Sequence, residues 1–262
     1  MKNIVILPAI ILAIFFAGCD DDDVNSNEVG SIRIEFDNRA GEADLAFNTD
    51  YTNSSGETFN VTKLNYYISN IRLTKTDGTE FVVPQDSSYF LVMEADEESQ
   101  LVTLNQVPAG DYNAITFTIG VDSLRSTMDI SKRTGALDPA QGDEGMYWTW
   151  NSGYIFFKIE GTSSAAPVEQ ENKFYYHIGG YGGYDSPTLN NIRETTVSMN
   201  GARAEVREGR SPQVHLHVDV LQLFSNPTSI RIADHHSVML SDFSTTISAN
   251  YVNMFSFQHV HN

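Results

Sequence analysis

Histidine is the residue type in this chain with the clearest chemical potential. All seven histidines follow residue 176, and in the run Val214–Val220 the polar residues His215, His217 and Asp219 alternate with apolar ones. An extended strand places these polar side chains on one face and the apolar ones in the core. Two neutral imidazoles at this separation can chelate a divalent or cuprous ion, and the carboxylate can complete the site or orient a histidine. The alternative is the solvated polar face of an outer strand.

The other histidines lie in different contexts. His177 ends an aromatic run and leads into a Gly-rich loop, so we expect it to face a site. His259 and His261 repeat the i, i+2 spacing in an expected last strand, where a frayed terminus would leave them passive. His235 and His236 are adjacent and point to opposite sides of any strand, which favours a surface loop.

The two tryptophans of the chain, Trp148 and Trp150, lie in one unusual segment, residues 146–161. In an extended segment both indoles share a face. Two interpretations compete: the pair anchors the apolar core, or it belongs to a functional site.

Other chemistries find little support in the sequence. The chain has one cysteine, no Gly-x-Ser-x-Gly and no phosphate-cradling or dinucleotide-binding glycine motif. Its 34 acidic residues offer too many candidates to single out a glycosidase pair. The net charge of −18 disfavours nucleic acid as a partner. We therefore expect a protein that is not an enzyme and binds no nucleic acid.

The N-terminus is typical of a bacterial lipoprotein. One basic residue, an apolar run and small residues precede Cys19, and four aspartates follow it. Residues 1–18 are too short for a spanning helix and predict a signal peptide. Acylation of Cys19 would anchor the chain in the bacterial cell envelope, at the outer membrane, on its periplasmic face or at the cell surface. Residues 19–28 are expected to form an acidic flexible tether.

Residues 29–262 are predicted to form a single all-β domain, an antiparallel β-sandwich with long loops. Period-two hydrophobic patterns recur along the chain, beginning with Ile32, Ile34 and Phe36. The dipeptides at 77–78 and 200–201, Asp-Gly and Asn-Gly, predict hairpin turns.

Helical patterns are confined to short pieces near 123–130 and 221–224. Two long Gly-containing loops are expected over 132–145 and 179–191. Loops of this length on a sandwich commonly carry binding residues.

Several segments together resemble the MbnP-like family, whose members are secreted copper-binding β proteins named for a partner of the copper chelator methanobactin. The resemblance extends from about Ser31 to His261. The segments that carry it are Leu64–Ile71, Val107–Tyr112 with Phe117–Asp122, Gly145–Tyr154 and Phe174–Gly179.

The resemblance implies a copper site in which imidazoles act beside an oxidised tryptophan. In relatives, a diheme cytochrome c peroxidase-like partner converts one tryptophan to kynurenine, whose aryl amine and carbonyl add donors for copper. Carried over to this chain, the resemblance implies Trp148 or Trp150 as the oxidised residue and His177, His215 and His217 as the ligands.

Metal acquisition or handling in the envelope is the implied function, with an outer-membrane transporter as a further partner. The residues leave a second hypothesis open, a non-metal ligand- or partner-binding module of a cell-surface complex. In that case the Tyr/Gly loop over 179–184 would contact a glycan or a protein.

Overall fold

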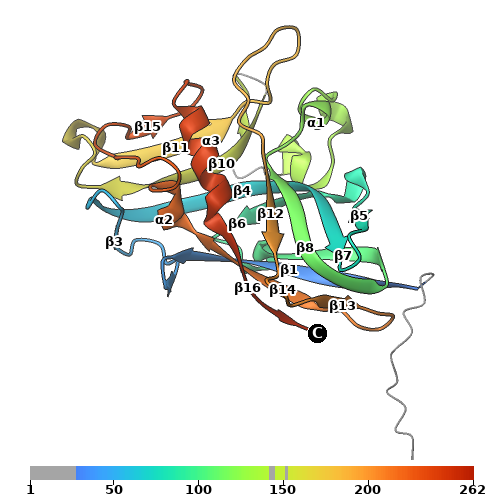
Figure 1. The fold of residues 1–262 in the computed structure, drawn as a ribbon. Helices are drawn as coiled ribbons and strands as arrows, with labels where there is room; N and C mark the ends of the chain where they lie inside the picture. The colour runs from blue at the N-terminus through green and yellow to red at the C-terminus, as the bar shows by residue number, and fades with distance from the viewer. Residues whose placement is uncertain (1–27, 142–144, 151–152) are drawn as a thin grey trace, which may run out of the picture.

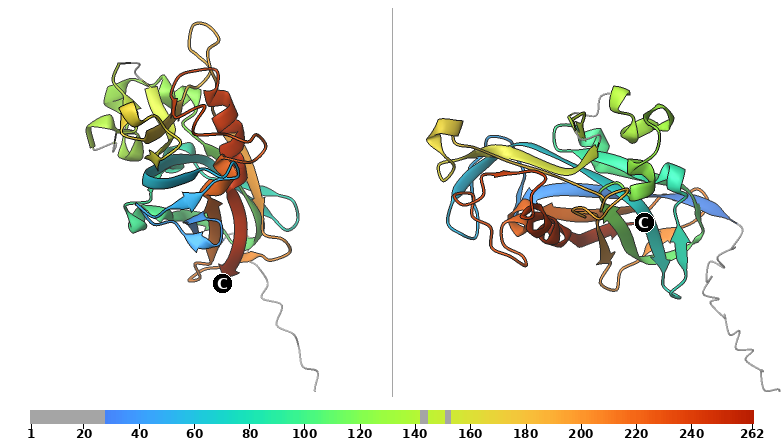
Figure 2. Two further views of the ribbon diagram at one scale, coloured as in Figure 1. Left: turned by 90° about the vertical axis from the view of Figure 1, so that its left-hand side faces the viewer. Right: turned by 90° about the horizontal axis from the view of Figure 1, so that it is seen from above.

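The computed structural model describes residues 28–141, 145–150 and 153–262. The predicted signal peptide, Cys19 and the tether up to residue 27 lie outside these residues. Two β-sheets pack around one large apolar core, which confirms the predicted all-β sandwich (Figures 1 and 2). No helix in the described part of the chain has both the length and the apolar character needed to cross a membrane.

The smaller sheet, sheet A, contains the first and the last strand of the domain. β1 runs parallel to β14, and β16 runs antiparallel to β14 on its other side. The strand order is β16 (Phe255–His261), β14 (Gln213–Asp219), β1 (Val29–Ala40) and β2 (Ala43–Asp44), with β7 (Leu101–Pro108) also paired to β1. Residues from both ends of the chain therefore meet on this sheet.

The larger sheet, sheet B, is antiparallel except where β15 joins β11. Its main path is β12 (Arg193–Ser198), β8 (Gly110–Ile119), β4 (Thr58–Lys75), β10 (Gly153–Ser163), β11 (Lys173–Gly179) and β15 (Ser237–Val238). Short strands extend it: β13 (Ala204–Val206) on β8, β9 (Tyr147–Trp148) on β10, and β3 (Tyr51–Thr52), β5 (Glu80–Val82) and β6 (Tyr89–Met93) on β4.

Helices are few and short in the described residues. α1 (Ser123–Ser126) and α2 (Val220–Leu223) lie where short helices were predicted, whereas α3 (Ser244–Tyr251) was not predicted. Ile247 and Tyr251 of α3 are fully buried, so this helix closes one side of the sandwich (Figure 1). The 3-10 turns are η1 (Gln85–Ser87), η2 (Glu97–Gln100), η3 (Ile130–Lys132), η4 (Gly135–Leu137), η5 (Pro139–Gln141), η6 (Val168–Gln170) and η7 (Val252–Met254).

A second apolar cluster covers the outer face of sheet B at one end. Alternate residues of β10 divide between the two cores, because Phe157 and Ile159 enter the main core while Tyr154 and Phe156 point outward. The outward pair packs with Tyr67, Val121, Leu137, Met146 and Trp148. The predicted loop over 132–145 therefore lies, in its described part, against the sheet through its short helical turns.

The two predicted hairpin turns have different outcomes. β4 and β5 are antiparallel neighbours joined through Asp77-Gly78, with Gly78 at φ +85°, as predicted. The hairpin prediction at Asn200-Gly201 is wrong, because β12 and β13 both pair with β8 and lie end to end along it. β8 is long enough to pair with both, so the turn returns the chain to the same partner strand.

Candidate metal site

Strand β14 presents its histidines on the outer face of sheet A. Val214, Leu216 and Val218 are fully buried in the main core, and His215 and His217 alternate with them. The predicted division of the two faces is confirmed.

The last strand brings two further imidazoles to His215. In the β14–β16 register His215 pairs with His259, while Leu216 pairs with Phe257, so Gln258 is the extra residue of a β-bulge. The bulge directs Phe257 toward the core and the two histidines after it toward the outer face. The prediction of a frayed terminus is wrong, because β16 pairs with β14 as far as His261, opposite Gln213.

His215, His259 and His261 form the three-histidine cluster. One ligand nitrogen from each lies within 4.8 Å of the others. The rings of His215 and His259 are stacked with their centroids 4.1 Å apart. The Nε2 atoms of His259 and His261 are 2.7 Å apart, so one donates a hydrogen bond to the other. A metal ion can replace the shared proton and bind both nitrogens.

Glu35 fixes the tautomer of His215. It lies opposite His215 in the β1–β14 register, and its Oε2 is 2.7 Å from Nδ1 of that ring. This ionic contact favours the proton on Nδ1, which leaves the lone pair on Nε2. Gln213 Nε2 donates to Glu35 Oε2 at 2.6 Å and to His215 Nε2 at 3.1 Å, so a metal ion bound at this nitrogen would replace the Gln213 hydrogen bond. This carboxylate–imidazole arrangement is typical of metal-binding histidines.

The electrostatics keep His215 in its metal-binding form. Partial burial lowers its pKa, and the neighbouring His259 and His261 lower it further, whereas Glu35 raises it. The net direction is downward, so the ring is neutral at neutral pH. Neutral imidazole is the form that coordinates a metal ion.

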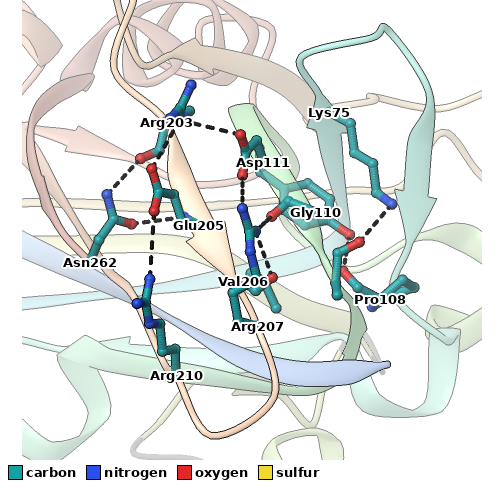
Figure 3. A network of polar contacts seen from close by, with 12 residues as sticks. Lys75, Pro108, Gly110, Asp111, Arg203, Glu205, Val206, Arg207, Arg210 and Asn262 are labelled. Carbon is teal, nitrogen blue, oxygen red and sulfur yellow. Dashed lines mark hydrogen bonds and ion pairs between the residues drawn. The ribbon is translucent and has the colours of Figure 1, made fainter. Parts of the chain in front are cut away.

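A polar network holds the end of β16 in place, although His261 is exposed. Asn262 accepts a hydrogen bond from the Glu205 backbone N–H at 2.7 Å and donates to the Arg203 carbonyl at 3.1 Å (Figure 3). Arg203 and Arg207 both contact Asp111, which ties this corner to β8. These hydrogen bonds fix Asn262, the residue after His261, in position beside the cluster.

The two other polar residues of the β14 pattern have different partners. His217 Nε2 is 3.6 Å from Asp37 Oδ2, and no third ligand group joins them among the described residues. Asp219 accepts hydrogen bonds from the backbone N–H groups of Gly41 and Leu221 at 2.8 and 3.0 Å. It therefore caps α2 instead of completing a site with His215.

His177 lies on the other sheet. Its Nε2 is 2.8 Å from Glu160 Oε1, and Lys158 Nζ is 3.5 Å from the same oxygen. The His177 hydrogen bond, with Lys158, lowers the pKa of Glu160 to about 2 against the effect of partial burial. His177 is thus hydrogen-bonded through Nε2 to an ionised carboxylate.

The tryptophans lie near His177 and away from the cluster. Trp148 is buried and packs directly over Gly179, because a Cβ at Gly179 would lie 2.7 Å from the indole. Gly179 is two residues from His177 and on the same face of β11. Strand β9 ends at Trp148 and residues 149–150 form a turn, so the segment is not extended through Trp150. Trp150 is 67% exposed, and its ring centroid is 5.6 Å from that of Trp148.

The predicted ligands therefore form two separate sets. The neighbours of His177 on β11 and the neighbours of His215 on β14 are buried in the same core. Because side chains alternate along a strand, both histidines face outward, and they lie on opposite faces of the sandwich. The structure does not bring His177, Trp148 or Trp150 together with His215 and His217.

A sequence model of the MbnP family matches residues 29–241. The chain belongs to the MbnP family. A solved structure, MbnP from Methylosinus trichosporium, has a similar fold with a TM-score of 0.55 and 16% sequence identity, over 79% of this chain and 80% of that chain. No curated protein matches the chain in sequence. Membership suggests a methanobactin-associated protein and is compatible with copper handling.

In this MbnP family member, sequence reasoning found His215 but missed its partners. The i, i+2 spacing of His259 and His261 was visible, yet nothing local indicated the bulge that turns them outward. Glu35 and Gln213 carry no motif, because they come from two strands far apart in sequence. The three imidazoles supply nitrogen donors that suit copper, zinc and other borderline metals.

Proposed function

We propose that this MbnP family member is a non-catalytic copper-binding protein that serves metal acquisition or handling in the bacterial envelope. The main support for this proposal is the three-histidine cluster, in which three imidazole nitrogens lie close together and Glu35 contacts the ring of His215. Copper is bound by His215, His259 and His261, with His217 beside Asp37 on the same face.

The donor set supports copper over metals that prefer oxygen ligands. Imidazole nitrogens bind copper and zinc well, and copper(II) stands at the top of the stability order for divalent first-row metals. The chain's one cysteine is the predicted lipid attachment site, so thiolate ligands play no part. Because His261 is exposed, the metal can be exchanged with an acceptor.

The proposal includes oxidation of a tryptophan, which would take place near His177 and away from the three-histidine cluster. Trp148 lies beside His177 on the outer face of sheet B, and Trp150 is open to a partner. A diheme peroxidase-like protein would convert one of these indoles to kynurenine, which adds donors near His177. An outer-membrane transporter is the proposed destination or source of the metal, and acylated Cys19 holds the chain at the membrane.

Copper binding is tested on the soluble chain from residue 24 by titration with Cu(I) in competition with a chromogenic chelator. The expected result is one tightly bound ion per chain, weakened at least about tenfold when His259→Ala removes one of three ligands. His236→Ala is the matched control, since that histidine lies outside the cluster. Equal copper retention by the wild type and by a His215→Ala/His259→Ala double variant would overturn the assignment.

A further inference from the structure

A pocket of about 320 Å³ opens between the loop over 179–191 and the strands that carry Trp148 and Tyr154. This loop projects from the end of the molecule opposite the C-terminus and the three-histidine cluster (Figures 1 and 2). Side chains lining the pocket include Trp148, Tyr154, Tyr181, Tyr184, Leu189 and Leu240.

The pocket is uncharged although the chain is strongly acidic. No Asp, Glu, Lys, Arg or His belongs to its lining among the described residues, whereas the whole chain carries 34 acidic and 16 basic residues. A charged ligand would lose its hydration here without gaining a partner. The lining therefore selects an uncharged ligand.

One aromatic side chain of the pocket lining, and a second that packs on the buried Trp148, are exposed to solvent. Tyr184 is 78% exposed and Trp150 is 67% exposed, with the Trp150 ring inclined at 45° to that of Trp148. Large aromatic rings left in water, beside an uncharged pocket, are typical of recognition surfaces. The hydroxyls of Tyr181, Tyr184 and Thr188 add polar groups at the same place.

The loop that forms one wall is built in a fixed shape. Gly183 has φ +90°, and a Cβ there would lie 2.0 Å from the Ser186 carbonyl oxygen, so only glycine fits. Hydrogen bonds from Gly182 N to Leu189 O at 3.0 Å and from Asn191 N to Gly180 O at 2.8 Å close the loop on itself. The pocket is thus formed before any ligand arrives, which lowers the entropy cost of binding.

We propose that this pocket binds a neutral sugar ring of an oligosaccharide. A pyranose has apolar C–H faces that stack on aromatic rings and hydroxyl edges that pair with tyrosine and threonine hydroxyls. The volume is at the lower end of the about 300–1,000 Å³ found for ligand sites, which suits one or two rings. Sugar binding does not involve the three-histidine cluster, although the pocket contains Trp148, one of the two candidates for oxidation.

Intrinsic fluorescence tests this proposal directly, because Trp148 lines the pocket and Trp150 packs against Trp148 with ring centroids 5.6 Å apart. The soluble chain is titrated with cellohexaose, maltohexaose, mannohexaose and xylohexaose. We expect a saturable change in emission with at least one of them. Trp150→Ala and Tyr184→Ala should each weaken that binding about tenfold, a loss of about 1.4 kcal/mol. Both residues are highly exposed, so the variants should fold, and Trp148 remains as the reporter.

Val168→Ala is the control, since this residue is exposed and apolar but does not line the pocket. It should bind the sugar as the wild type does, and so should His259→Ala. No response to any of the four sugars up to about 10 mM, a dissociation constant too weak for recognition, would overturn the proposal. Binding that survives Trp150→Ala and Tyr184→Ala unchanged would also overturn it, because the sugar would then bind elsewhere.

Discussion

Replacing Glu35 tests whether this carboxylate orients His215 for metal binding in the three-histidine cluster. The carboxylate makes no contact with the proposed metal, yet its Oε2 lies 2.7 Å from His215 Nδ1, an ionic contact that favours the proton on that nitrogen. In Glu35→Ala this acceptor is lost, so the His215 proton is free to move to Nε2 and block the ligand position. The variant should therefore weaken copper binding while every ligand remains present.

The expected loss of copper affinity follows from the role of Glu35 in orienting His215. Loss of a residue that orients a metal-binding histidine costs about 10–100-fold in metal affinity, which corresponds to about 1.4–2.7 kcal/mol. Glu35→Ala should lie near the upper end of this range. Glu35→Gln should lie near the lower end, since an amide oxygen can still accept from Nδ1–H without the charge.

The assay is a Cu(I) competition titration at pH 7.5 that compares both variants with Glu208→Gln, an exposed position outside the cluster. Thermal unfolding without metal separates loss of affinity from loss of fold. Copper affinity in Glu35→Ala equal to that of the wild type, in a folded protein, would refute the orienting role.

Three further predictions rest on separate contacts. Copper at a hundred times its dissociation constant should stabilise the folded chain by about 2.7 kcal/mol, seen as a higher unfolding temperature, and the tenfold weaker binding expected for His259→Ala should about halve this gain. Asn262→Ala removes the hydrogen bonds to Glu205 and Arg203 and should weaken copper binding by about threefold to tenfold, whereas Asn253→Ala should not. The pKa of Glu160 is depressed from 4.5 to about 2, so its contacts stabilise the fold above pH 4.5 and are lost as the pH falls toward 2. Glu160→Gln should therefore lower stability at pH 7 and flatten its decline between those pH values, which acid titration followed by circular dichroism will show.

Period-two patterning predicted the sandwich because burial on one face leaves a local trace in every strand. In β14 the alternation of Val214, Leu216 and Val218 with the histidines was sufficient to assign both faces. The same rule fails in β16, since strict alternation places Phe257 and His259 on one face. Only pairing with β14 introduces the extra residue Gln258 and separates them.

Helix α3 was missed for a related reason. Its sequence, Ser244–Tyr251, combines serine, threonine, isoleucine and tyrosine, which individually do not favour helix. Tertiary contacts define it instead, because Ile247 and Tyr251 enter the core and Ser248 donates a hydrogen bond to the Asn191 side chain. Such long-range contacts leave no periodic signal in the sequence.

The geometry of the cluster also indicates which histidine moves when a metal binds. Two imidazole nitrogens bound to one ion at about 2.0–2.1 Å and a tetrahedral angle lie about 3.3 Å apart. The Nε2 atoms of His259 and His261 are 2.7 Å apart, so they must separate by a few tenths of an ångström. His215 is held by Glu35 and stacked on His259, whereas His261 is exposed at the end of the strand. In the proposed site we therefore expect His215 and His259 to form the fixed part, and His261 to close on the ion last and release it first.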